Sequence, residues 1–129
     1  MNAMAKTILV IGYGSTLRSD DGVGQHVAHE VAAQGWPGVR SMALPQLTPE
    51  LAAEIAQAKL VIFVDAVEGQ TGVQTADVSS EVGTTGAMTH HATPQGLLAL
   101  AQTLYAACPP AMLVSVPGVH FELGEGLSA

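Results

Sequence analysis

Residues 7–24 read TILVIGYGSTLRSDDGVG, and this stretch decides the fold. Its first part, TILVIG at 7–12, is a short, continuous apolar run, which is typical of a parallel strand buried on both faces. From Asp21 to Gln34 the apolar residues then recur at helical spacing. A buried strand, a glycine-containing loop and a helix in this order predict the first unit of an α/β fold.

Strands and helices are expected to alternate along the rest of the chain. After the helix at 21–34 we expect a strand at 39–44, a helix at 48–58, strands at 59–66 and 70–78, a helix at 93–107 and a strand at 111–118. Thr48 is the expected N-cap of its helix, and Asp65 is expected to end its strand. Residues 81–89, EVGTTGAMT, are expected to form a mobile loop. The pattern predicts a three-layer α/β sandwich, with a mostly parallel doubly wound sheet and helices on both faces.

Composition indicates a single folded domain over residues 1–129, with 1–5 as a flexible tail. The chain is 48% hydrophobic and 12% charged, with a formal net charge of −7. Its four basic residues are scattered, so we expect neither nucleic acid nor an anionic membrane as a partner. The single cysteine, Cys108, excludes an internal disulfide and a cysteine-based metal site. No signal-peptide core or membrane-length apolar run is present, so the cytoplasm is the expected location.

Three aspartates stand where this fold places ligands, at or just beyond the carboxyl ends of parallel strands. Asp20 and Asp21 lie at the start of the first helix, where acids also have a structural role as caps and as partners of the helix dipole. Asp65 follows the apolar run VIFV, where a carboxylate is partly desolvated unless it has a partner. Both interpretations stay open for the adjacent pair, whereas the position of Asp65 favours a functional role.

His90 and His91 follow the expected loop and precede a helix. Paired histidines are often solvated surface residues. If His90 lay beside two strand-end carboxylates, however, the three side chains would suit a divalent ion such as nickel, zinc or iron. His26 and His29 lie on the polar side of the first helix and are expected to be solvated.

Several familiar sites do not fit this chain. GYGSTL resembles the dinucleotide fingerprint, but Leu17 stands at the third glycine position and no acid ends the second strand. A phosphoacceptor receiver domain carries its acids directly at the strand end and needs a late lysine, whereas the last lysine here is Lys59. The chain contains no G-x-S-x-G nucleophile elbow.

The chain resembles the maturation endopeptidases of nickel-iron hydrogenases. The resemblance spans residues 7–127 and rests on ILVIGYGSTLRSDDGVG, PQLTPELAAEIAQAKLVIFVDA, VIFVDAVEG and the Thr-His pair at 89–90 before a leucine-rich helix. It implies a cytoplasmic enzyme that removes the C-terminal extension of a hydrogenase large subunit after nickel insertion. It also implies a monomer or weak dimer, and members of the family usually continue beyond GEGLSA into a final helix.

The resemblance also implies which residues carry the chemistry. The family's metal-contacting and catalytic positions fall on Asp21, Asp65 and His90, with His91 as the alternative histidine. The nickel is expected to be carried by the substrate. Hydrolysis is expected to use either the metal or an aspartate base. A different class of function stays open, namely a non-hydrolytic metal-sensing chaperone that binds a hydrogenase subunit.

Overall fold

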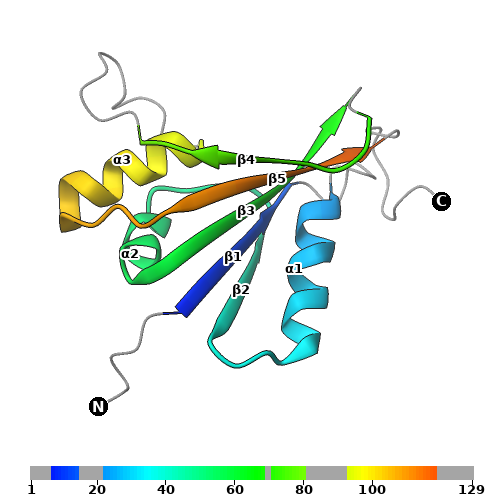
Figure 1. The fold of residues 1–129 in the computed structure, drawn as a ribbon, viewed down its shortest axis with the longest axis horizontal. Coiled ribbons are helices and arrows are strands. Elements are labelled where there is room, and N and C mark those ends of the chain that lie inside the picture. The colour runs from blue at the N-terminus through cyan, green and yellow to red at the C-terminus, as the bar shows by residue number, and fades with distance from the viewer. Residues whose placement is uncertain (1–6, 15–21, 69–70, 81–92, 119–129) are drawn as a thin grey trace.

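The computed structural model describes residues 7–14, 22–68, 71–80 and 93–118. This part of the chain contains five strands and three helices, which alternate except where β4 directly follows β3 (Figure 1). In chain order they are β1 (Thr7–Tyr13), α1 (Val23–Gln34), β2 (Val39–Leu44), α2 (Leu51–Ala56), β3 (Ala58–Glu68), β4 (Gln74–Val78), α3 (Pro94–Tyr105) and β5 (Ala111–Gly118).

The strands form one sheet in the order β2-β1-β3-β5-β4. β2, β1, β3 and β5 are parallel, and β4 pairs antiparallel with β5 at one edge. Figure 1 shows α1 on one face of this sheet and α2 with α3 on the other. Right-handed connections require this arrangement, because the chain first moves outward from β1 to β2 and then returns across β1 to β3. The predicted three-layer, mostly parallel fold is confirmed.

Alternate residues of the two central strands enter different layers. Leu9 and Ile11 of β1, together with Val61 and Phe63 of β3, join the core cluster that α2 and α3 cover. Val10 and Val64 are also buried but point the other way, toward α1. This double burial explains why both strands are continuous apolar runs in the sequence.

Two glycines allow α1 to lie directly against the sheet. A Cβ atom on Gly12 would overlap the backbone oxygen of Gly24, and a Cβ atom on Gly24 would lie 2.6 Å from the backbone oxygen of Val64. The first turn of α1 therefore packs on the backbone of β1 and β3, close to their carboxyl ends.

The ends of several elements differ from the sequence prediction. The strands predicted at 39–44 and 111–118 are confirmed with those bounds. The prediction that Thr48 is an N-cap is wrong: α2 begins at Leu51 after Glu50, and the Thr48 carbonyl instead accepts a turn hydrogen bond from Leu51 N at 3.1 Å. The edge strand begins at Gln74 rather than at residue 70.

Asp65 does not end its strand, contrary to the prediction. β3 continues to Glu68, because β5 supplies a parallel partner at every position from Asp65↔Ser115 to Glu68↔Gly118. The carboxylate therefore projects from regular strand backbone rather than from a loop.

In the described residues, no helix is long and apolar enough to cross a membrane.

Candidate active site

The carboxyl ends of β1 and β3 form the switch point of the sheet. From β1 the chain passes through α1 to β2 on one side, whereas from β3 it passes to β5 on the other. Open α/β sheets bind ligands in the crevice at such a point, because the two connections leave in opposite directions. Tyr13 is the last residue of β1, and Asp65 lies near the same end of β3.

A hydrogen bond joins these two residues across the switch point. The hydroxyl of Tyr13 donates to Oδ2 of Asp65 at 3.2 Å, and both side chains are partly buried. Burial raises the pKa of the Tyr13 phenol above its ordinary value, and the adjacent Asp65 carboxylate raises that pKa further. The phenol is therefore a neutral donor at any physiological pH.

The backbone that leaves β1 is held on both sides at Gly14. Its N–H donates to the Leu44 carbonyl at 3.1 Å, and its own carbonyl accepts from Nε2 of Gln25 at 2.6 Å. Gly14 has φ = 138°, a conformation that favours glycine. These contacts fix the point at which the chain enters residues 15–21.

The N-cap position of α1 belongs to Gly22, which makes no side-chain capping hydrogen bond. Neither Asp20 nor Asp21 therefore occupies the N-cap itself. Both aspartates lie outside the described residues, so their predicted roles stay predictions.

His90 and His91 also lie outside the described residues, in the stretch before α3. Thr93 caps that helix, with its Oγ1 accepting from Gly96 N at 3.0 Å, and Pro94 follows in the first turn. Figure 1 shows α3 ending on the side where β3 and β5 begin, so its first turn points back toward their carboxyl ends.

Of the predicted set Asp21, Asp65 and His90, the structure thus places Asp65 alone. Within the ranges that it describes, no group of three or more histidine, cysteine, aspartate or glutamate side chains could hold a metal ion. The convergence of the three predicted ligands remains a prediction.

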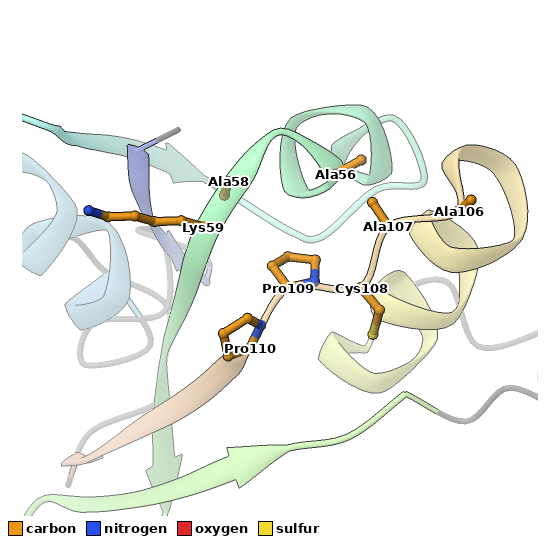
Figure 2. Close-up of a pocket in the computed structure, with 8 residues that line it drawn as sticks. All are labelled: Ala56, Ala58, Lys59, Ala106, Ala107, Cys108, Pro109 and Pro110. Carbon is orange, nitrogen blue, oxygen red and sulfur yellow. The ribbon is translucent and has the colours of Figure 1, made fainter. Parts of the chain in front are cut away.

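A hollow of about 370 Å³ lies at the other end of the sheet. Figure 2 shows it between the link from α2 to β3 and the link from α3 to β5, beside the exposed Cys108. From Ala58 at this end to Asp65 is seven residues of strand, or roughly 23 Å. The hollow is therefore separate from the switch point.

Sequence reasoning missed Tyr13. The signal was the two-residue period of a strand: Leu9, Ile11 and Tyr13 share one face of β1, as Val61, Phe63 and Asp65 share the same face of β3. The pairing of Gly12 with Val64 brings the following two residues side by side. The register between β1 and β3 is set by tertiary packing. The contact between Tyr13 and Asp65 could therefore be identified only in the folded structure.

The comparisons with known proteins find the same fold among solved structures. HybD, a hydrogenase-maturating endopeptidase from E. coli, is 23% identical with a TM-score of 0.64, and the match covers 95% of this chain and 80% of that one. A [NiFe] hydrogenase maturation protease from Thermococcus kodakarensis, also called HybD, is 18% identical with a TM-score of 0.69, covering 95% and 86%. HycI from the same organism is 21% identical with a TM-score of 0.67, covering 95% and 81%.

This chain has the fold of the hydrogenase maturation endopeptidases. The expected resemblance is confirmed at the level of structure over nearly the whole chain. No protein-family model matches the sequence, and no curated protein matches it.

Proposed function

We propose that this protein is an endopeptidase that removes the C-terminal extension of a nickel-iron hydrogenase large-subunit precursor. One observation carries the proposal: a partly buried aspartate, Asp65, stands at the switch point of a sheet whose fold matches that of maturation proteases. A carboxylate near the carboxyl ends of the central strands is placed for chemistry on a ligand rather than for packing.

The start of α1 supports Asp21 as the second carboxylate of the proposed site. Gly24 packs on the backbone oxygen of Val64, the residue before Asp65. Asp21 directly precedes Gly22, the N-cap of that helix. The close packing of α1 thus brings the chain that follows Asp21 beside the strand that carries Asp65.

The third proposed ligand is His90, with His91 as the alternative. Two carboxylates and one imidazole form an incomplete coordination shell, and the open positions are left for other ligands. We propose that these positions are filled by the substrate, which brings nickel already bound to its own side chains. Shared coordination would make cleavage depend on metal loading, because an empty precursor offers no ion to recognise.

Cleavage itself is the addition of water across one peptide bond. The water oxygen joins the acyl carbon, one proton goes to the leaving amine, and the C–N bond breaks. Two routes fit the proposed residues: the substrate's metal polarises the carbonyl or the water, or an aspartate removes the proton from water.

The test is the mass of a large-subunit precursor after incubation with the full chain, with and without nickel loading. The proposal expects loss of a C-terminal peptide from the nickel-loaded sample only. Equal shortening of both samples would contradict the proposal that the enzyme recognises nickel bound to the precursor. A stable complex with no change in the precursor's mass would contradict the proposed peptidase activity and favour a chaperone that binds the subunit.

A further inference from the structure

We propose that Tyr13 is a positioning residue for Asp65: its hydroxyl holds the carboxylate in the orientation that the substrate meets. The inference rests on the proposed endopeptidase function and adds to it a residue outside the expected ligand set. It stands on the hydrogen bond from the Tyr13 hydroxyl to Oδ2 of Asp65, which is 3.2 Å long.

The backbone fixes both partners. Tyr13 ends a strand whose register with β3 is parallel from Ile8↔Leu60 to Gly12↔Val64, and the ring of Tyr13 packs against the buried core. The phenol is thus anchored at its ring and free to donate at its tip, which is how amphipathic aromatic residues orient polar neighbours. Second partners of this kind hold a ligating carboxylate in one rotamer and exclude orientations that point elsewhere.

A neutral donor suits this carboxylate better than a cation would. Tyrosine fixes Oδ2 without cancelling the negative charge that a metal ion needs. The two described basic residues are engaged or remote: Arg40 pairs with Glu54 at 2.7 Å, and Lys59 lies six strand residues before Asp65, roughly 20 Å away. The hydroxyl of Tyr13 therefore orients the Asp65 carboxylate without supplying a counter-charge.

The chain offers a matched pair of variants, because it contains two tyrosines. Tyr13→Phe removes the donor and keeps the ring, whereas Tyr105→Phe makes the same chemical change at an exposed site on α3. With nickel-loaded precursor, we expect Tyr13→Phe to lower kcat/KM by about 10-fold to 100-fold, the usual effect of losing such a supporting partner. Tyr105→Phe is expected to retain the full rate.

A second measurement needs no substrate and reads the orientation itself. Three-bond NMR couplings of the labelled full chain report the side-chain rotamer of Asp65. We expect one dominant rotamer in the unmodified protein and in Tyr105→Phe, and averaging between rotamers in Tyr13→Phe. A purely structural role for the hydroxyl would lower stability without changing these couplings.

The two measurements separate the failure of each idea. If the unmodified protein cleaves no precursor, the proposed function falls, while rotamer averaging in Tyr13→Phe still supports the positioning role. If the protein cleaves but Tyr13→Phe keeps both the full rate and the single Asp65 rotamer, the positioning role is overturned and the proposed function stands. An unchanged rotamer overturns the positioning role in either case.

Discussion

At the scale of single residues, the partly buried carboxylate of Asp65 is the feature that packing alone does not require. A partly buried charge is unfavourable unless hydrogen bonds replace its lost hydration. Tyr13 supplies one such bond from the neighbouring strand. The fold therefore tolerates this carboxylate near the switch point of the sheet, where open α/β sheets bind ligands.

The two proposed carboxylate ligands should be essential to cleavage but not to folding. Asp65→Ala and Asp21→Ala are each expected to reduce precursor cleavage by at least about 100-fold, because each removes a group that contacts the metal or the water. Asp20→Ala is the matched control, since it removes the adjacent acid and is expected to affect stability more than rate. Circular dichroism and the mass assay check this prediction, and a folded but inactive Asp20→Ala protein would reassign the ligand.

The raised pKa of Tyr13 predicts how stability depends on alkaline pH. In the unfolded chain the phenol loses its proton near pH 10.0, whereas in the folded chain it keeps the proton to higher pH. Above about pH 10 the folded state therefore binds more protons, and its stability falls as pH rises toward the folded pKa of Tyr13. Below about pH 10 the contribution of Tyr13 to the free energy of unfolding is fully present.

Urea unfolding between about pH 9 and pH 11 tests this sign. The unmodified protein and Tyr105→Phe are expected to lose stability more steeply than Tyr13→Phe, which lacks the titrating group. Equal slopes in all three proteins would show that Tyr13 titrates alike in the folded and unfolded states.

At the scale of elements, the contact of α1 with the sheet sets the geometry of the site. Helix and strands approach so closely that their backbones meet at Gly12 and Gly24. A side chain at either position would push the first turn of α1 away from β1 and β3. The start of α1 would then move away from the strand that carries Asp65.

Gly24→Ala should therefore be strongly destabilising. Its Cβ would meet backbone oxygens of Tyr13 and Val64, which have no flexible side-chain end to yield, so we expect a loss of about 3 kcal/mol in the free energy of unfolding. Gly38→Ala is the matched control: Gly38 has φ = 75° with open space around it, so strain alone costs about 1 kcal/mol. Urea unfolding compares the two, and equal losses would contradict a close helix contact.

At the scale of the whole molecule, two ends of the sheet have different characters. The carboxyl ends of β1 and β3 carry the Tyr13–Asp65 pair, whereas the amino ends of β3 and β5 border the hollow beside Cys108 (Figure 2). The two ends are separated by roughly 20 Å or more of strand, so a molecule bound at the hollow does not contact the Tyr13–Asp65 pair. The proposed substrate meets the first of these ends.

Cys108 provides a test of which end of the sheet meets the substrate, because it is exposed and is the single cysteine in the chain. A bulky maleimide attached to Cys108 is expected to leave the rate of precursor cleavage unchanged, since the label sits at the end of the sheet remote from Asp65. Mass spectrometry checks both the labelling and the cleavage. A large loss of rate in the labelled protein would place the substrate against the hollow instead.

The sequence by itself determined the order of elements and the class of fold. Continuous apolar runs at 7–12 and 60–64 indicate burial on both faces, and helical spacing from Asp21 indicates one covered face, because these patterns depend on local periodicity. The position of Asp65 after such a run was also readable. The ends of the elements were predicted less accurately. The length of β3, for example, depends on how far β5 continues beside it.

Only the tertiary structure decided which side chains meet. The register between β1 and β3 pairs Tyr13 with Asp65, and the glycine contact fixes α1 against the same strands. Tyr13 and Asp65 are 52 residues apart in the chain, so no local period encodes their contact. Strand order, register and close backbone approach depend on how the whole chain packs. That packing places the Tyr13 hydroxyl within hydrogen-bond distance of the Asp65 carboxylate.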